Sequence, residues 1–303
     1  MLLSRWKHRA LRRQLRNLVQ EQGVTHIHAE FADITALLAC ETAHRMNIPF
    51  SVGIHAADIH LAKYPMLTLF RGVSFVLACN QAVSDALAEQ LPGIQEKIHL
   101  IPHGVDLRFW QYRPALPATK KLLFVGRLVP KKGLALLLKA LTELPEEISL
   151  TIVGDGPMST EWKALAQSLG VASRVRWMGV LPREGVREQM EQARALVMPS
   201  IVDAEGNRDG IPNVVTEAMA MGLPVIGTQV GGLPEVLTED TGWITRQENP
   251  TVLANAISLC LGQPAQTEQR RAKARLFIEQ NFDAKRLAKQ RASVFRRSRT
   301  SKM

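Results

Sequence analysis

Residues 199–224 read PSIVDAEGNRDGIPNVVTEAMAMGLP and carry the strongest structural signals in the chain. The apolar run at residues 195–198 directly before them predicts a buried strand. Pro212 stands where a proline is tolerated in the first turn of a helix, and the Ala- and Met-rich residues after it continue that helix. A second short apolar run follows at residues 224–227. The order strand, loop, helix, strand is typical of a parallel sheet flanked by helices.

The same alternation extends in both directions along the chain. Short Val- and Ile-rich runs alternate with segments of helical periodicity, which predicts two parallel sheets. The expected strands of the first sheet lie at residues 25–29, 50–54, 75–79 and 98–101, with helices at 36–45 and 82–90. Those of the second lie at 121–125, 149–153, 175–178, 195–198, 224–227 and 242–244, with a helix at 133–141. The predicted fold class is α/β, with two Rossmann-like, doubly wound parallel-sheet domains.

Residues 107–119, LRFWQYRPALPAT, separate the two sheets. They contain two prolines and several aromatic residues without periodicity, which is typical of a linker. The expected organisation is a first domain at residues 1–106, this linker, a second domain at 120–280, and a basic C-terminal helix or tail at 281–303.

Composition narrows the class of protein. The chain has 303 residues, 46% of them apolar and 22% charged, which excludes a disordered or collagen-like protein. Its three cysteines are far apart in the sequence, so neither a disulfide framework nor a zinc cluster is indicated. No apolar run approaches the roughly 18 residues of a membrane-spanning helix, and the N-terminal segment lacks the apolar core of a signal peptide. We therefore expect a cytoplasmic protein.

The net charge of +10 is concentrated at the two ends of the chain. Residues 1–20 contain six Lys or Arg and no acidic residue, and residues 269–303 contain twelve against Glu279 and Asp283. Because the chain has only two tyrosines and no RNA or DNA motif, nucleic-acid binding is not expected. Two interpretations of the basic ends stay open, namely solvated helices with basic faces or attraction to an anionic membrane surface.

Two loops of the expected second sheet have features of a phosphate-binding site. The strand at 121–125 is followed by GRLVPKKG at residues 126–133, in which Arg127 and Lys132 could neutralise a diphosphate. A basic, solvated loop is the simpler alternative. The next strand is followed by GDGP at residues 154–157, which predicts a tight turn. Both loops follow parallel strands of one sheet, so we expect them at the same edge.

The start of the helix after Pro212 is a second candidate anion site. The backbone amides of Asn213 and Val214 would point at an anion, aided by the helix dipole. Asp209 before the helix and Glu217 within it lie eight residues apart and could recognise sugar hydroxyls. The simpler alternatives are that Asp209 complements the helix dipole and that Glu217 is an exposed helix residue.

Histidines mark the strand ends of the first domain. His55 directly follows the strand at 50–54, at its carboxyl end. His26 and His28 alternate along the first expected strand with Glu30 nearby, but their spacing leaves further metal ligands unspecified, so a metal site is not indicated. We expect His28 and Glu30 to be strand-end residues that face the cleft between the domains.

Together these motifs resemble glycosyltransferase family 4, whose members are retaining, nucleotide-sugar-dependent enzymes with the GT-B fold. The similarity covers nearly the whole chain. The segments that carry it are IPHGVD at residues 101–106, the turn at 126–133, GDGP at 154–157, and the block from DGIPN to EAMA at 209–220. Residues 205–224 are most similar to bacterial exopolysaccharide transferases of the colanic-acid type.

The resemblance implies a role for each candidate residue. His55 would contact the sugar from the first, acceptor-side domain, Asp209 would contact the transferred sugar, and Glu217 would bind the nucleotide ribose. The donor-binding residues would be Gly126, Arg127, Lys132, Gly154, Asp155, Gly210, Ile211, Pro212, Asn213 and Val214. The expected donor is a UDP- or GDP-sugar and the expected acceptor a lipid-linked saccharide, with no metal or other cofactor. The location implied is the cytoplasm, at the inner face of the plasma membrane.

Two departures from the family pattern affect these expectations. The first of the family's two acidic residues is usually glutamate, whereas here it is Asp209, with Glu205 nearby, which leaves the donor sugar open. The chain also begins with a helix and then what resembles the fourth strand of the first domain, so that domain is expected to lack its N-terminal start. The leading hypothesis is a retaining hexosyltransferase of cell-surface polysaccharide biosynthesis. The alternative is a donor-binding but inactive, truncated GT-B protein.

Overall fold

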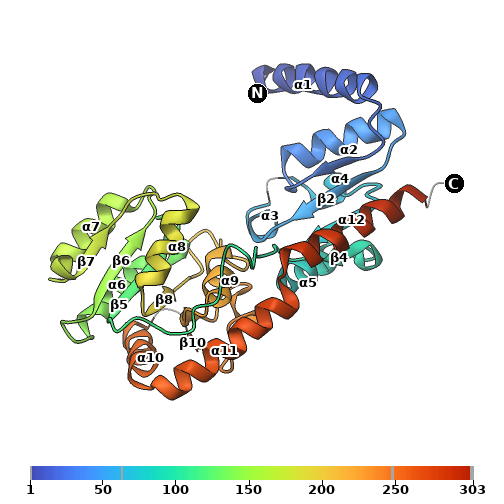
Figure 1. The fold of residues 1–303 in the computed structure, drawn as a ribbon. Coiled ribbons are helices and arrows are strands. Elements are labelled where there is room, and N and C mark those ends of the chain that lie inside the picture. The colour runs from blue at the N-terminus through green and yellow to red at the C-terminus, as the bar shows by residue number, and fades with distance from the viewer. Residues whose placement is uncertain (1, 63, 247–248, 301–303) are drawn as a thin grey trace. The chain divides into compact units, whose positions relative to one another are not determined.

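The computed structural model describes residues 2–62, 64–246 and 249–300, and it contains two compact units (Figure 1). The first unit comprises the residues up to Pro102 together with those from Lys289 onward, and the second comprises His103–Ala288. Residues 107–119, expected as a linker, contain neither helix nor strand and group with the second unit. The expected basic C-terminal segment forms helix α12 (Ala284–Thr300), whose last turns group with the first unit.

The first unit is built on a four-stranded parallel sheet with the order β1-β2-β3-β4. The strands are β1 (Ile27–Ala29), β2 (Phe50–Ile54), β3 (Phe75–Ala78) and β4 (Ile98–Leu100). Helix α1 (Leu2–Glu21) precedes the sheet, and the connections contain α2 (Ile34–Met46), α3 (Ala56–His60), α4 (Met66–Leu69) and α5 (Gln81–Gln90).

The connecting helices cover one face of this sheet. Right-handed crossovers between parallel strands that follow chain order place each connecting helix on the same side. Accordingly, Phe50, Val52 and Ile54 of β2 lie in one buried cluster with residues of α2 and α5. On the opposite face, Phe75 of β3 contacts Phe295 of α12, with ring centroids 5.0 Å apart. This packing explains why the end of α12 groups with the first unit.

Polar side chains determine where the helices of the first unit begin. Oδ1 of Asp33 accepts a hydrogen bond from the amide of Thr35 at 2.7 Å, so α2 begins at Ile34, two residues before the predicted start. Oδ1 of Asn80 accepts a hydrogen bond from the amide of Val83 at 2.9 Å, which places the start of α5 at Gln81.

The second unit contains a six-stranded parallel sheet with the order β10-β9-β8-β5-β6-β7. Its strands are β5 (Lys121–Val125), β6 (Ser149–Val153), β7 (Val175–Trp177), β8 (Ala195–Met198), β9 (Val225–Thr228) and β10 (Trp243–Thr245). The helices are α6 (Leu134–Thr142), α7 (Ser159–Ser168), α8 (Arg183–Gln192), α9 (Asn213–Ala220), α10 (Pro250–Gly262) and α11 (Pro264–Asn281). Numbered from β5, this strand order is the 3-2-1-4-5-6 order of a Rossmann fold.

Helices bury both faces of the second sheet. Leu122 and Phe124 of β5 pack in a cluster with α6, α7 and α10, whereas Leu123 packs in a second cluster with α9 and α11. Strands that are buried on both faces have continuous apolar sequences. The strands at 50–54, 121–125, 149–153 and 195–198 have the predicted bounds, and the other predicted strands differ from the observed ones by one or two residues at one or both ends.

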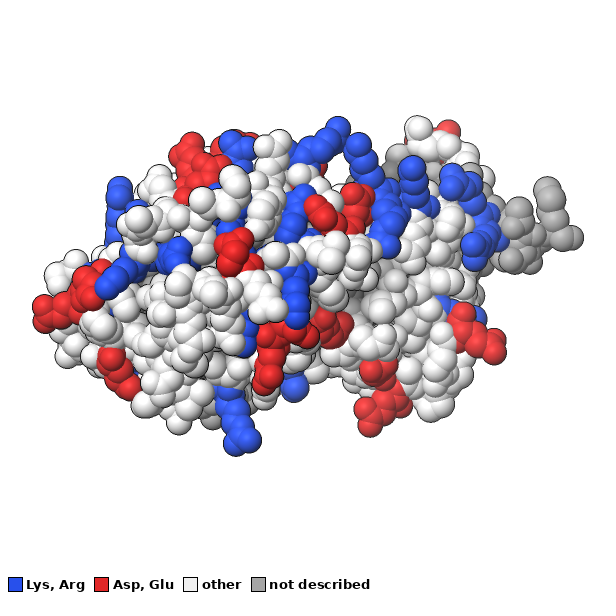
Figure 2. All heavy atoms as spheres, turned by 60° about the horizontal axis from the view of Figure 1, so that its bottom comes forward, with Lys and Arg blue, Asp and Glu red and all other residues white. Residues whose placement is uncertain are grey.

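Charged side chains are unevenly distributed over the surface. On the face drawn in Figure 2, basic side chains gather in the upper right part and are interspersed with acidic ones elsewhere. Helix α12 contributes exposed basic residues at Lys285, Arg286, Lys289, Arg296 and Arg297. In the part of the chain that the structure describes, no helix is both long enough and apolar enough to cross a membrane.

Candidate functional site

The strand order of the second sheet reverses between β5 and β8. These two strands are neighbours, but the chain continues from β5 to β6 on one side and from β8 to β9 on the other. The loops that follow such strands diverge, and the crevice outside their carboxyl ends is where ligands bind in open α/β sheets. Here the two loops are residues 126–133 after β5 and residues 199–212 after β8, both of which contain candidate residues from the sequence.

The loops after β5 and β6 pack backbone against backbone. The amide of Gly126 donates to the carbonyl of Val153 at 3.0 Å, and that of Leu128 donates to the carbonyl of Asp155 at 2.9 Å. Gly154 has a φ of +131°, and a side chain there would overlap the carbonyl oxygen of Gly126. This confirms the prediction that the 126–133 turn and the GDGP turn lie together, and it shows why the second turn requires glycine.

The loop after β5 also contacts the loop after β8. The amide of Ile201 donates to the carbonyl of Lys131 at 2.9 Å. Gly133 has a φ of +64°, and a side chain there would overlap the carbonyl oxygen of Pro199. The glycine therefore allows the basic turn to approach the residues that lead to α9.

Asp209 is buried and paired with the two lysines of the basic turn. Its Oδ2 lies 2.8 Å from Nζ of Lys132 and accepts a hydrogen bond from Oγ of Ser200 at 3.0 Å. Its Oδ1 lies 3.3 Å from Nζ of Lys131. The side chain of Arg127, in contrast, is exposed. The carboxylate thus lies directly beside the positive charge predicted to bind a diphosphate.

Helix α9 begins directly after Pro212, as predicted. Pro212 has a φ of −65°, and helical geometry leaves the amides of Asn213 and Val214 without an intrahelical acceptor. The segment before the helix is packed tightly, because a side chain at Gly231 would overlap the carbonyl oxygen of Asp209. Asp209, with its paired lysines, is therefore held in the packed segment that leads directly to the helix N-terminus.

Glu217 lies in the second turn of α9 and is partly buried. Burial raises the pKa of its carboxyl group, and the charge of Arg183 at the start of α8 partly opposes that shift. The guanidinium of Arg183 lies over the ring of Phe109, with Cζ 3.9 Å from the ring centroid. Glu217 is therefore not the exposed helix residue of the simpler alternative.

Three residues of this site did not stand out in the sequence. Lys131 and Ser200 contact Asp209, and Arg183 acts on Glu217 through its charge. Lys131 is adjacent to the predicted Lys132 and could have been included on its position alone. Ser200 and Arg183 gave no local signal, because only the packing of the loops brings them to the site.

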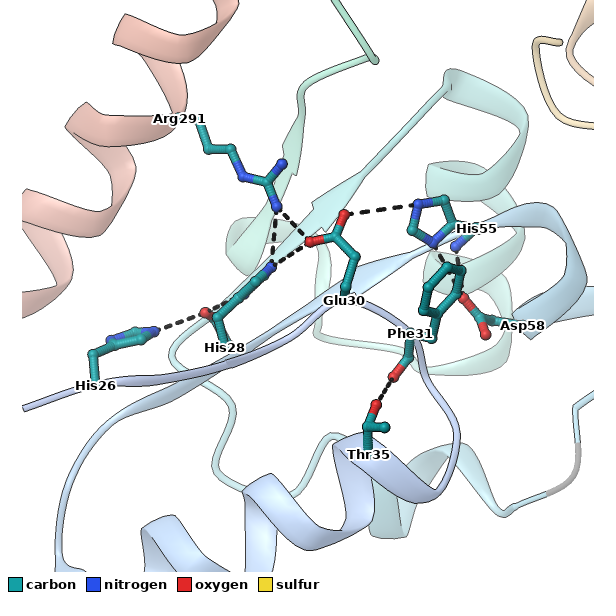
Figure 3. Close-up of polar contacts among 9 residues, drawn as sticks. His26, His28, Glu30, Phe31, Thr35, His55, Asp58 and Arg291 are labelled. Carbon is teal, nitrogen blue, oxygen red and sulfur yellow. Dashed lines mark hydrogen bonds and ion pairs between the residues drawn. The ribbon is translucent and has the colours of Figure 1, made fainter. Parts of the chain in front are cut away.

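In the first unit, His55 follows β2 as predicted and is the N-cap residue of α3. Its backbone amide donates to Oδ2 of Asp58 at 2.9 Å, and its ring lies 4.6 Å from the ring of Phe31, measured between centroids (Figure 3). His26 and His28 both contact Oγ of Ser51. In the described ranges, no three or more His, Cys, Asp or Glu side chains are grouped so that they could hold a metal ion.

Two family models match the sequence of this chain. The model of Glycosyl transferases group 1 matches residues 110–277, which is more than half of the chain, and that of Glycosyltransferase Family 4 matches residues 1–109. The chain belongs to the glycosyl transferases group 1 family. The first match includes the basic turn, the GDGP turn and α9, and the second includes His55.

Two curated relatives of this chain are named for bacterial polysaccharide biosynthesis. WcaL of Escherichia coli (strain K12), assigned by its name to colanic acid biosynthesis, is 31% identical over 185 residues, or 58% of this chain and 46% of WcaL. The amylovoran biosynthesis glycosyltransferase AmsK of Erwinia amylovora is 30% identical over 216 residues, or 69% of this chain and 52% of AmsK. The chain spans about half the length of these two relatives.

Solved glycosyltransferase structures share the fold. Alr3699/HepE of Anabaena in complex with UDP superposes with a TM-score of 0.82 at 21% identity, covering 94% of this chain and 82% of that chain. Sucrose-phosphate synthase of Thermosynechococcus elongatus superposes with a TM-score of 0.80 at 22% identity, covering 95% and 77%. These similarities confirm the GT-B fold expected from the sequence.

Proposed function

We propose that this protein is a retaining glycosyltransferase that moves a hexose from a nucleotide diphosphate sugar to a lipid-linked saccharide. The product belongs to an exopolysaccharide or another cell-surface polysaccharide. The observation that carries this proposal is the crevice at the reversal of the second sheet, where Lys131, Lys132, the start of α9 and the buried Asp209 meet. The pathways for which WcaL and AmsK are named support an exopolysaccharide as the product.

The diphosphate is the part of the donor that this crevice fits best. Arg127 and Lys132 supply charge, and the amides of Asn213 and Val214 supply hydrogen-bond donors at the positive end of a helix. The charge that the leaving nucleoside diphosphate develops is stabilised by the same groups. HepE was solved with UDP-glucose bound, which supports a UDP-sugar as the first donor to test.

The carboxylates of Glu217 and Asp209 bind the ribose and the sugar of the donor. Glu217 binds the nucleotide ribose, and Asp209 contacts the transferred sugar once the diphosphate draws Lys132 away from it. His55 of the first unit contacts the sugar. In a retaining transfer, the acceptor oxygen bonds to the anomeric carbon on the face that the diphosphate leaves, and the departing phosphate oxygen takes the acceptor proton.

We also propose that transfer needs no divalent metal ion. Two lysines, Arg127 and a helix N-terminus already supply the positive charge that a metal would bring to the diphosphate. Activity that survives an excess of EDTA is expected. Activity that is lost with EDTA and restored by Mg²⁺ or Mn²⁺ would overturn this part of the proposal.

The lipid-linked acceptor implies a location at the inner face of the plasma membrane. Helix α1 has exposed Leu11 and Leu18 on a helix that is rich in arginine, as in helices that lie in a membrane surface. Sedimentation with vesicles that contain anionic lipid should deplete the protein from solution, and neutral vesicles should not. Equal behaviour with both vesicles would contradict a charge-driven membrane association.

Titration calorimetry with a panel of UDP- and GDP-sugars tests the donor site directly. The double variant Arg127→Ala/Lys132→Ala should lose binding of the donor that the wild type selects. The matched control is Lys139→Ala/Arg176→Ala, which removes two exposed cations elsewhere on the second unit. Binding that survives in the first variant would place the donor elsewhere.

A transfer assay then separates an enzyme from a protein that only binds the donor. Sugar transfer to a lipid-linked saccharide, or slow hydrolysis of the bound donor, supports catalysis. Donor binding without either reaction would favour the inactive alternative.

A further inference from the structure

The carboxylate of Glu30, directly after β1, is shared by three side chains of the first unit (Figure 3). Its Oε2 accepts a hydrogen bond from Nη2 of Arg291 at 2.7 Å and lies 3.2 Å from Nε2 of His28. Its Oε1 lies 3.9 Å from Nε2 of His55, which is within ion-pair distance but longer than a hydrogen bond. One oxygen is therefore anchored, and the other faces the ring of His55, which the resemblance to glycosyltransferase family 4 implies as a contact of the sugar.

The anchored side of Glu30 is held through a chain of contacts on β1 and β2. Nδ1 of His28 lies 2.8 Å from Oγ of Ser51, and the other nitrogen of the ring faces Glu30. The ring of His28 also packs against Phe295 of α12, with centroids 5.2 Å apart. Since both ring nitrogens of His28 have partners and the ring also packs against Phe295, the ring has little freedom to rotate. It therefore fixes the position of Oε2.

The backbone of Glu30 is equally constrained. A side chain at Gly53 of β2 would lie 2.9 Å from the carbonyl oxygen of Glu30, so the two strands can approach this closely only because residue 53 is glycine. Gly53 is two residues before His55. The close approach therefore brings the backbone of Glu30 near the end of β2, which His55 follows.

The ring of His55 is contacted on its other sides as well. Asp58 Oδ2 lies 3.6 Å from Nδ1, and Phe31 covers a ring face. Glu30 lies on the Nε2 side. Although partial burial raises the pKa of Glu30, Arg291 and His28 lower it to below its ordinary value, so Glu30 is a carboxylate at neutral pH.

We propose that Glu30 is a positioning residue for His55, and that Arg291 and His28 hold it in place for that task. This inference rests on the proposed function, in which His55 contacts the transferred sugar. Glu30 does not touch the sugar itself. It orients the imidazole through Nε2, and the contact shortens when the ring is engaged, as contacts of catalytic groups often do on substrate binding.

A merely structural role for Glu30 explains these contacts less well. The side chains of Glu30 and Arg291 are 44% and 38% exposed, and ion pairs this exposed contribute little to stability. Helix α12 also has an apolar contact with the sheet that does not involve Glu30, that of Phe295 with Phe75. If Glu30 only attached α12 to the sheet, the position of its Oε1 near His55 would be unexplained.

The first test follows the His55 ring by NMR, in the full chain and without substrate. Glu30→Gln keeps the shape of the side chain and removes its charge, and it should shift the ring resonances of His55, assigned with His55→Ala. Arg291→Gln should shift them in the same direction, and Arg291→Lys should restore part of the wild-type spectrum. Arg296→Gln, an exposed arginine of the same helix, is the matched control. Unchanged His55 resonances in a folded Glu30→Gln protein would overturn the proposal.

The second test asks whether Glu30 acts through His55 in the reaction. Glu30→Gln should lower kcat between about ten- and a hundred-fold, with the Kd of the nucleotide sugar unchanged, because the diphosphate is bound by the second unit. In the His55→Ala background, the same change should have no further effect. Losses that multiply would show that Glu30 acts independently and would overturn the proposal. If the wild type transfers no sugar, the proposed function fails, whereas the NMR test still decides the role of Glu30.

Discussion

Nζ of Lys132 lies 2.8 Å from Oδ2 of Asp209, so the cation expected at the donor diphosphate is paired with the carboxylate expected at the donor sugar. Asp209 is almost completely buried, with 7% of its surface exposed. A buried carboxylate needs partners of this kind. In the proposed donor site, binding of the diphosphate would exchange one partner of Lys132 for another, so Asp209 would compete with the diphosphate for Lys132 as well as contact the sugar.

Replacing Asp209 should separate these two roles. Asp209→Asn removes the charge that competes for Lys131 and Lys132, so UDP alone should bind about three- to ten-fold more tightly, a gain of roughly 1 kcal/mol. The preference for a UDP-sugar over UDP should fall, because the carboxylate no longer accepts hydrogen bonds from sugar hydroxyls. Calorimetry with both ligands measures the two effects.

The control for this prediction is Asp240→Asn, which removes an exposed carboxylate that is paired with Lys273. It should leave both affinities as in the wild type. An affinity for UDP that does not rise in Asp209→Asn would show that Asp209 does not compete with the diphosphate.

Glycine is required in the loops of the crevice for space as well as for backbone conformation. Gly133→Ala and Gly154→Ala place a methyl group onto the carbonyls of Pro199 and Gly126. Gly170→Ala is the matched control for Gly133→Ala, because Gly170 has a φ of +71°, close to the +64° of Gly133, but open space around it. The control should lose about 1–2 kcal/mol of unfolding free energy from its positive φ alone.

The two loop variants should lose about 1–3 kcal/mol more than this control, because the overlap must be relieved by moving backbone. Urea unfolding of the three variants measures the differences. Equal losses in all three would mean that conformation, and not the packing of the loops, explains the glycines.

Glu217 should make stability depend on pH. Burial raises the pKa of Glu217 in the folded protein above its ordinary value of 4.5, with Arg183 partly opposing the shift. Between the unfolded and the folded pKa, the folded state therefore binds more protons, and stability falls as pH rises through that window. Glu217→Gln removes this loss, so it should be more stable than the wild type at pH 7, with the difference shrinking as pH falls towards 4.5.

Unfolding at several pH values checks this expectation. Arg183→Gln, which removes the opposing charge, should steepen the fall in stability with rising pH. A wild type and a Glu217→Gln variant whose stabilities change in parallel with pH would rule out the assignment to Glu217.

Arg271 of α11 ties the segment before β5 to the second unit. Its side chain is fully buried, its Nε donates to the carbonyl of Gly222 at 2.6 Å, and its Nη2 donates to the carbonyl of Arg113. Arg271→Met leaves these carbonyls without a donor and should cost about 3 kcal/mol of unfolding free energy. Lys273→Met, which breaks an exposed pair two residues away, should cost less than about 1 kcal/mol. Similar losses in urea unfolding would show that the buried guanidinium is dispensable.

How well the sequence predicts each element depends on how much of the signal is local. The strands at 121–125 and 149–153 are buried on both faces, so their apolar runs mark both ends. The edge strand β1 begins at Ile27 instead of the predicted residue 25, because the residues before it are polar. The observed helix starts also differ from the predicted ones, because a single capping side chain such as Asp33 determines where a helix begins.

In the candidate site, too, the sequence predicted the features that have a local signal and missed those that depend on distant residues. The basic turn and the GDGP turn were predicted to share a sheet edge, because each directly follows a parallel strand. The pairing of Asp209 with Lys131 and Lys132 was not predicted, since 77 residues separate Lys132 from Asp209 and no periodicity links them. The contacts of Glu30 were missed in the same way, although Glu30 and His28 were both noted as strand-end residues.

The sequence by itself therefore determined the types of the elements, the loops that need glycine, and the residues at the strand ends, because each depends on residues that are near in the chain. Only the tertiary structure decided which of these residues meet. Arg291 reaches Glu30 across 261 positions of sequence because the crossovers leave one face of the first sheet for α12 to cover. Lys132 reaches Asp209 because the strand order of the second sheet places β5 beside β8. Strand order and crossover side are properties of the whole chain, so they have no local signature.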